Sequence, residues 1–152
     1  TIFALSSGYT GQQATALAVL RLSGPNAHDV LRSMMMSNKT TLPPARQAAL
    51  RKLYYNGVML DHALVLRFDG PHSFTGEDLV ELHCHGSRAV VQGMLDVLPK
   101  IRITTMERSG SGEERAAAAS YCRMAEPGEF TQRAFGNGKF VMSSNDPGLP
   151  KA

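Results

Sequence analysis

Three side chains that could do chemistry lie two residues apart in the stretch GEDLVELHCHG, residues 76–86. Read as a β-strand, this stretch places Glu81, His83 and His85 on one face, because successive side chains of a strand point to opposite sides. The apolar residues between them, with Cys84, would face the core. A carboxylate beside two imidazoles suits three kinds of site: a metal centre, an acid–base pair, or the polar wall of a ligand pocket.

A metal centre built from these three side chains is the weakest of the alternatives. Residues two apart on a strand are separated by about 6.6 to 7 Å, so the side chains would have to bend inward to share one ion. The sequence has no second Cys/His pair at metal-ligand spacing. Cys84 is also poorly placed as a nucleophile, because the strand directs it away from both histidines. The spacing therefore favours a polar strand face or a pocket wall.

Two cations complete the set of candidate binding residues. Arg21 interrupts the apolar run ALAVLRLS, and a charge in such a strand needs a partner or a ligand. Lys139 follows a Gly-Asn-Gly turn, but the first glycine and the hydroxyl residue of a phosphate-binding P-loop are both missing. Together Arg21, Glu81 and Lys139 could hold an anionic heterocyclic ligand. The cations would meet its carboxylates, and Glu81 would accept hydrogen bonds from its ring N–H groups.

The elements that must position these residues follow from hydrophobic periodicity and turn residues. Strands are predicted at 1–7, 16–23, 48–55, 58–68 and within 76–86, with a hairpin turn at Asn56-Gly57. Helices are predicted from Pro25 to Met35, from Ser87 to a stop at Pro99, and briefly within 125–139. Residues 101–123 are predicted to form a flexible insertion, with one or two exposed helical turns in its Ala-rich part. We expect one α+β domain, a mixed sheet with helices on one face.

Composition narrows the function classes. The chain has 152 residues, 43% of them hydrophobic and 19% charged, which is ordinary globular composition. The net charge is only +3, and the lysines and arginines are scattered, so the sequence alone indicates no RNA-binding surface. The two cysteines, outside any CxxC pair, are expected to be reduced thiols. No apolar run approaches the length of a membrane span. Since Thr1 is preceded by no Met or basic leader, we expect that a targeting segment was removed or the chain was clipped.

Five motifs, in order along the chain, resemble the N-terminal domain of the tRNA-modification GTPase family MnmE, also called TrmE. They are TIFALSSG, AVLRLSGP, LDHALVLRF, SFTGEDLVELHCHG and EPGEFTQRAFGNGK. The likeness is strongest to the mitochondrial branch. It implies a fold resembling the folate-binding domain of glycine-cleavage aminomethyltransferase, and homodimerisation near the folate site. It also implies that Arg21, Glu81 and Lys139 bind a tetrahydrofolate derivative, 5-formyl- or 5,10-methylene-tetrahydrofolate.

The same resemblance implies a role in the cell. Proteins of this family act with an MnmG/GidA-type flavoprotein to modify C5 of the wobble uridine of tRNA, and in mitochondria the product is a taurinomethyluridine. We therefore expect a mitochondrial location. The family's helical and GTPase domains have no counterpart in this sequence, and GTP, magnesium and potassium would bind only in that GTPase domain. Whether this chain is itself an enzyme is left open by the sequence.

The resemblance assigns residues 1–140 to the tetrahydrofolate-binding and dimerisation domain, with 141–152 as a divergent tail. Two departures bear on the pocket: the loop GYTGQQAT before Arg21 is longer than the family's usual one, and residues 101–123 look inserted. If these changes spoil the pocket, the chain would be a non-catalytic dimerisation or interaction module, which is the alternative reading of its function.

Overall fold

The computed structural model describes residues 1–7, 15–35, 41–103, 106–108, 114–116 and 120–139. Its strands, in chain order, are β1 (Ile2–Leu5), β2 (Leu17–Ser23), β3 (Ala49–Tyr55), β4 (Val58–Phe68), β5 (Leu79–His85), β6 (Arg102–Ile103), β7 (Met106–Arg108), β8 (Glu114–Ala116), β9 (Ser120–Tyr121) and β10 (Arg123–Met124). Its helices are α1 (Ala27–Met34), α2 (Arg88–Val97), the short 3₁₀ helix η1 (Leu98–Lys100) and α3 (Glu129–Gly136).

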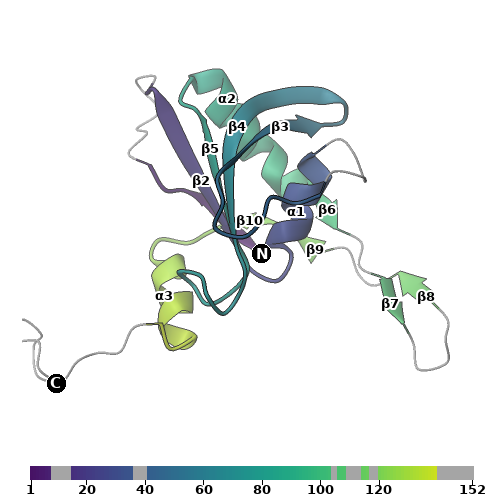
Figure 1. Ribbon diagram of the computed structural model, residues 1–152, viewed down its shortest axis with the longest axis vertical. Helices are drawn as coiled ribbons and strands as arrows, with labels where there is room; N and C mark the ends of the chain where they lie inside the picture. The colour runs from purple at the N-terminus through teal and green to yellow at the C-terminus, as the bar shows by residue number, and fades with distance from the viewer. Residues whose placement is uncertain (8–14, 36–40, 104–105, 109–113, 117–119, 140–152) are drawn as a thin grey trace, which may run out of the picture.

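One six-stranded mixed sheet organises the chain, in the order β10-β1-β2-β5-β4-β3 (Figure 1). β10 runs parallel to β1, and every other neighbouring pair in this sheet is antiparallel. The remaining described strands form two small antiparallel pairs, β6 with β9 and β7 with β8. The sheet brings β2 and β5 together although more than 50 residues separate them, and this pairing positions the candidate site.

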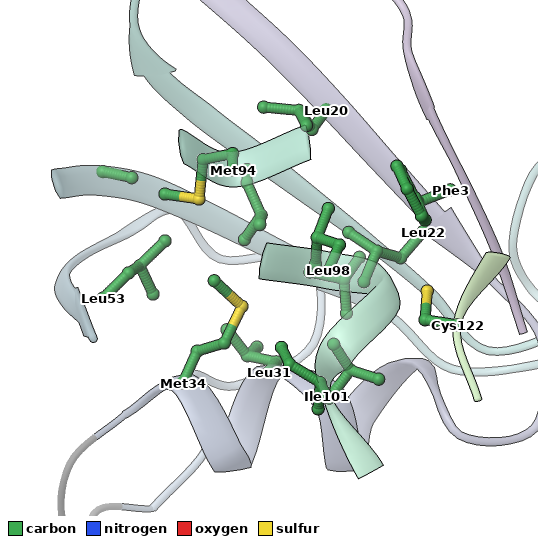
Figure 2. Packing of buried hydrophobic residues seen from close by; sticks show 14 of the residues in the cluster. Phe3, Leu20, Leu22, Leu31, Met34, Leu53, Met94, Leu98, Ile101 and Cys122 are labelled. Carbon is green, nitrogen blue, oxygen red and sulfur yellow. The ribbon is translucent and has the colours of Figure 1, made fainter. Parts of the chain in front are cut away.

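The core lies between one face of the sheet and helices α1 and α2. On β2 and β5 every second side chain is buried, as the alternation predicts, with Leu20 on β2 and Leu82 on β5 fully enclosed. Helix α1 buries Leu31 and Met34, which its helical spacing places on the same stripe. Figure 2 shows Leu31 and Met34 of α1 in the same packed layer as Met94 of α2. The expected α+β architecture is therefore present, with these two helices on one face.

The predicted helix ends are corrected by a few residues. Helix α1 begins at Ala27 rather than at Pro25, and Asn26 occupies the N-cap position. Helix α2 begins after Ser87, whose hydroxyl accepts a hydrogen bond from Val90 N, and so caps it as a serine there should. Helix α2 ends at Val97, before Pro99, as the proline predicts, and the separate 3₁₀ helix η1 carries Pro99 in its first turn.

The predicted insertion, residues 101–123, begins and ends inside the fold. Ile101 and Cys122 are buried in the core, and Arg123 pairs with Ile2 in the main sheet. The predicted exposed helical turn is wrong at 114–116, which form β8 paired with β7. At these residues, pairing with β7 outweighs the helix propensity of the local sequence. The three following alanines, like residues 8–14 and the tail 141–152, lie outside the described residues.

No helix in the described part of the chain is both long and apolar enough to cross a lipid bilayer. Both cysteines are free and buried, as the sequence predicts for reduced thiols. Burial raises the pKa of Cys122 to about 11. Burial, together with the nearby Asp61 carboxylate, raises the pKa of Cys84 to about 12. Cys84 faces the core and not the histidines beside it, as the strand alternation predicts.

Candidate functional site

Arg21 and Glu81 form the centre of the candidate site. They are directly opposite each other in the β2–β5 register, on the sheet face away from α1 and α2. Arg21 donates from Nη2 and Nε to Glu81 Oε1, at 2.7 and 3.1 Å. Their side chains are 28% and 17% exposed, so the pair is largely shielded yet reachable from solvent. The sequence left the partner of Arg21 open, and the structure shows that it is Glu81.

An aromatic ring lies over this ion pair. The guanidinium carbon of Arg21 is 5.4 Å from the centre of the Phe74 ring, within the range of a cation–π contact. Phe74 belongs to the loop that joins β4 to β5, and it is 44% exposed. An exposed ring beside a charged pair is a surface on which a flat heterocycle could stack. Sequence reasoning missed Phe74, because its role depends on how that loop folds back over β2.

The second carboxylate oxygen of Glu81 faces a histidine. His83 Nε2 lies 3.2 Å from Glu81 Oε2, so the carboxylate is held between a guanidinium and an imidazole. Glu81 and His83 share one face of β5, as the alternation predicts. Because Oε1 accepts both hydrogen bonds from Arg21, Oε2 is the oxygen with acceptor capacity left for a ligand N–H group.

Lys139, the third predicted residue, lies just beyond α3. Its backbone N–H donates to Ala134 O at 2.8 Å, which ends the helix. Its side chain reaches the loop between β4 and β5: a Cβ added at Gly76 would lie 3.4 Å from Lys139 Cε. Among the residues described, no hydrogen bond or ion pair joins the Lys139 ammonium to Arg21 or Glu81. The structure thus pairs two of the predicted residues directly and places the third against the loop that carries Phe74.

Glu77 anchors α3 to the sheet. Its carboxylate accepts from Ser23 Oγ at 2.7 Å and from Arg133 Nη1 at 3.1 Å to each oxygen. Asn137 completes the attachment, because its side-chain amide donates to Thr75 O at 2.7 Å. Sequence reasoning missed this role, although GED and EFTQR both stand in the motifs that carried the resemblance. These contacts hold Lys139 near the candidate site.

A second ion-pair system steadies the start of α3. Arg123 donates from both terminal nitrogens to the two oxygens of Glu129, at 2.6 and 2.8 Å. Arg133 contacts the same carboxylate at 3.0 Å, four residues further along the helix. The hydrogen bonds from Arg123 lower the pKa of Glu129 to about 2, with further help from the Glu126 N–H. Arg133 thus links the Glu129 system to Glu77.

His85 does not join the other two members of its strand face. Its ring Nδ1 lies 2.7 Å from Asp61 Oδ1, and its backbone N–H donates to Asp61 Oδ2 at 2.8 Å. Burial by itself raises the pKa of Asp61, but these hydrogen bonds and that from His62 outweigh it, and the net pKa is lowered. The three-ligand metal set considered from the sequence, Glu81 with His83 and His85, is therefore not assembled. The cause is a partner on β4 that strand spacing cannot reveal.

A different group among the described residues has ligand atoms close enough for a metal ion: His28, Asp69 and Asp78. Its contacts indicate a structural role. The two ring nitrogens of His28 face different carboxylates, at 3.7 Å from Asp69 and 3.5 Å from Asp78. Arg67 already pairs with Asp69 at 2.7 Å, and Asp78 accepts from Gly70 N at 2.9 Å. These bonds tie α1 to the loop between β4 and β5.

The described residues around Arg21 and Glu81 offer several groups that could hold a ligand, and the Glu81–His83 contact leaves the acid–base interpretation open. These residues offer a carboxylate oxygen for ring N–H groups, a guanidinium and an ammonium for anions, and an exposed aromatic ring. A nucleophile would need an activating base within hydrogen-bond reach, and the nearest thiol, Cys84, is buried on the opposite face. The groups around Arg21 and Glu81 have the chemistry that a flat, partly anionic ligand would need.

Comparison with known proteins gives one consistent result. The family model for the GTP-binding protein TrmE N-terminus matches residues 1–139. The chain is 45% identical over 145 residues to the mitochondrial 5-taurinomethyluridine-tRNA synthase subunit GTPB3 of Mus musculus, covering 94% of this chain and 25% of that protein. It is 43% identical over 143 residues to the tRNA modification GTPase MnmE of Caulobacter vibrioides, covering 94% and 26%.

A yeast relative extends the set. The mitochondrial tRNA modification GTPase MSS1 of Saccharomyces cerevisiae is 37% identical over 156 residues, covering 94% of this chain and 27% of that protein. The match therefore takes in nearly all of this chain but only about a quarter of the length of these curated relatives. The relatives come from bacteria and from mitochondria at similar identity.

Proposed function

The chain belongs to the family of the GTP-binding protein TrmE N-terminus, and from that premise we propose that it is a tetrahydrofolate-binding, dimerising module in tRNA modification. The ligand would be 5-formyl- or 5,10-methylene-tetrahydrofolate, held by Arg21, Glu81 and Lys139. The observation that carries this proposal is the Arg21–Glu81 pair, open to solvent beneath the ring of Phe74.

The chemistry of folate matches what these side chains offer. A pterin ring presents adjacent N–H donors, which Glu81 Oε2 can accept. The glutamate tail of folate carries carboxylates, which suit the Arg21 guanidinium or the Lys139 ammonium. Phe74 supplies a flat surface for stacking beside the pair. A fold related to the folate-binding domain of glycine-cleavage aminomethyltransferase belongs to the same proposal.

The role of the whole protein is proposed from its relatives. Their names describe tRNA modification GTPases and a taurinomethyluridine-tRNA synthase subunit. We place this chain's part in modifying C5 of the wobble uridine of tRNA, alongside an MnmG/GidA-type flavoprotein. GTP hydrolysis belongs to the family's GTPase domain, outside the region that this chain matches. The mitochondrial relatives support a mitochondrial location, which imaging of the tagged full-length protein would test.

Titration calorimetry with 5-formyl-tetrahydrofolate tests the folate site. Glu81→Ala should weaken binding by about 1 to 3 kcal/mol, because a shielded charge-assisted hydrogen bond is lost and Arg21 is left without its partner. Glu126→Ala is the matched control: Glu126 is exposed, and in the described part of the chain it forms no hydrogen bond or ion pair with Arg21 or Glu81. Absence of binding heat from a chain shown by circular dichroism to be folded would refute the folate proposal.

A second candidate function is homodimerisation without a working folate pocket. The observation that favours it is an apolar patch on the sheet face away from the helices, where Leu17, Leu50 and Leu64 are 49%, 54% and 37% exposed. Leu50 and Leu64 are directly opposite each other across β3 and β4, and Leu64 is opposite His83 on β5. We propose that a second copy of the chain covers this patch.

Sedimentation equilibrium separates the two functions. A dimer that Leu64→Glu dissociates, in a chain that binds 5-formyl-tetrahydrofolate, agrees with the first proposal. A dimer in a chain that takes up no folate points to the interaction module alone. A monomer at all concentrations would rule out the role of the patch in dimerisation, while leaving the folate titration as an independent test.

A further inference from the structure

A pocket far from the Arg21–Glu81 pair lies where segments from different parts of the chain meet. It encloses about 390 Å³. The described residues that line it are Ser33 of α1, Tyr54 and Tyr55 of β3, Asn56 of the hairpin turn, Lys100 of η1, the following Ile101, and Arg102 of β6. Helix α1 contacts both β3 and β6, and Figure 1 shows the end of β3, α1 and β6 on the same side of the molecule. We call it the Tyr54–Lys100 pocket.

The lining has a definite chemical character. Its described residues include two cations, Lys100 and Arg102, and no carboxylate. Tyr55, on the same side of β3 as buried Leu53, offers an aromatic ring and a hydroxyl group, whereas the strand directs the Tyr54 side chain to the other side. The Asn56 amide offers both a donor and an acceptor. Tyr55 is packed partly against the core, which limits the motion of its ring. Cations beside an aromatic ring and an amide match a phosphate joined to a heterocyclic base.

The size of the pocket agrees with this ligand class. Pockets for small organic ligands enclose roughly 300 to 1,000 Å³, and this one lies at the lower end of that range. A nucleotide is of that size, and stacking of bases on aromatic side chains tolerates any base, since every base has a π-face.

The Tyr54–Lys100 pocket is separate from the folate site. Tyr55 is opposite Val58 at one end of β4, and Glu81 is opposite Leu66 near the other end. These two positions on β4 are eight residues apart, which at a strand rise of about 3.3 Å per residue is up to about 26 Å. One folate molecule placed at Glu81 therefore leaves this pocket available to another ligand.

We propose that the Tyr54–Lys100 pocket binds a nucleotide, with the phosphate at Lys100 and Arg102 and the base against Tyr55. The nucleotide is either free or part of a single RNA strand, and the two sources share this chemistry. The fold places Lys100 and Arg102 beside β3. In the proposal, this placement is what lets the two cations bind one anion. This inference goes beyond the folate site, and it takes single-stranded RNA as its probe from the proposed role in tRNA modification.

Fluorescence anisotropy of a labelled oligouridylate tests the pocket in the 152-residue chain. Lys100→Ala should weaken binding several-fold and should reduce the slope of log K against log salt by about 0.7, the value for one lost phosphate contact on a single strand. Tyr55→Ala, in a chain shown by circular dichroism to be folded, should weaken binding about tenfold through lost stacking, whereas Tyr55→Phe should keep it. Lys52→Ala is the matched control, because Lys52 is exposed on the same strand β3 but does not line the pocket.

Competition identifies the source of the nucleotide. Displacement of the oligonucleotide by uridine monophosphate supports a free nucleotide, and binding of the oligonucleotide alone supports RNA. Inorganic phosphate that competes as well as uridine monophosphate would overturn the assignment of a base to the pocket. Equal losses from Lys100→Ala and Lys52→Ala would overturn the pocket itself, since binding would then follow overall charge. Lys100→Ala should leave 5-formyl-tetrahydrofolate binding unchanged, so the two proposals fail separately.

Discussion

Gly76 is a position at which both the backbone conformation and the surrounding atoms require a glycine. Its φ is +79°, a conformation that costs most residues with a Cβ roughly 1 to 2 kcal/mol. Gly57, in the hairpin turn, has the same φ of +79°. The two differ in their surroundings: a Cβ at Gly76 would lie 2.8 Å from Asn137 Cβ, while a Cβ at Gly57 would meet no atom within 4 Å. Gly57→Ala is therefore the control for Gly76→Ala, because it loses only the stability that a positive φ costs a residue with a Cβ.

The difference between the two alanine variants measures the close approach of α3 to the loop. In Gly76→Ala the end of α3 must move, and the 2.7 Å hydrogen bond from Asn137 Nδ2 to Thr75 O is strained or lost. A lost hydrogen bond of this kind costs about 1 kcal/mol, and overpacking typically costs about 1 to 3 kcal/mol. We expect Gly76→Ala to be less stable than Gly57→Ala by about 2 kcal/mol. For a domain of this size, that excess lowers Tm by about 4 to 8 °C more.

Thermal unfolding and hydrogen exchange together test this reasoning. The amide of Lys139, which donates to Ala134 O, should exchange faster in Gly76→Ala and at the parent rate in Gly57→Ala. Affinity for 5-formyl-tetrahydrofolate should fall in Gly76→Ala alone, because Lys139 moves with the end of α3. Equal Tm losses in the two variants, with unchanged exchange at Lys139, would refute the claim that close packing at Gly76 positions this helix.

Further predictions concern titrating groups. The pKa of Glu129 is about 2 in the folded chain against 4.5 ordinarily, so the unfolded chain binds the extra proton between these values. Stability from Glu129 is thus present above about pH 4.5 and is lost toward about pH 2, and Glu129→Gln should flatten this loss in urea midpoints measured across that range. Cys84 and Cys122, with pKa values of about 12 and 11, should resist a thiol reagent near pH 8 when folded and react fully in guanidinium chloride. Rapid labelling of the folded chain would contradict their burial.

Much of the fold could be predicted from local patterns. Alternation on β5 identifies which side chains face the core, because a strand has a period of two whatever it pairs with. The stripe of Leu31 and Met34 identifies the buried side of α1 for the same kind of reason. The prediction was wrong for the Ala-rich segment at 114–116, where pairing with β7 overrides helix propensity.

The candidate site was only partly predictable. Residue type singled out Arg21 and Glu81, since a charge in an apolar strand needs a partner. Their contact spans 60 positions in the chain, and spacing along a sequence carries no signal for it. The sequence analysis did not identify Phe74 or Arg133. In a sequence, an exposed aromatic residue or a helix arginine looks like an ordinary surface residue.

The sequence by itself determined the faces of the strongly periodic elements, such as β5 and α1, and it carried the motifs by which the family is recognised. Only the tertiary structure decided which residues come together. It pairs Arg21 with Glu81 and His85 with Asp61, and it places Lys100 and Tyr54 around one pocket. The physical reason is that periodicity is local, arising from the backbone geometry of a few residues. Strand register and helix docking instead depend on side chains packing across the whole core, where each contact is set by all the others.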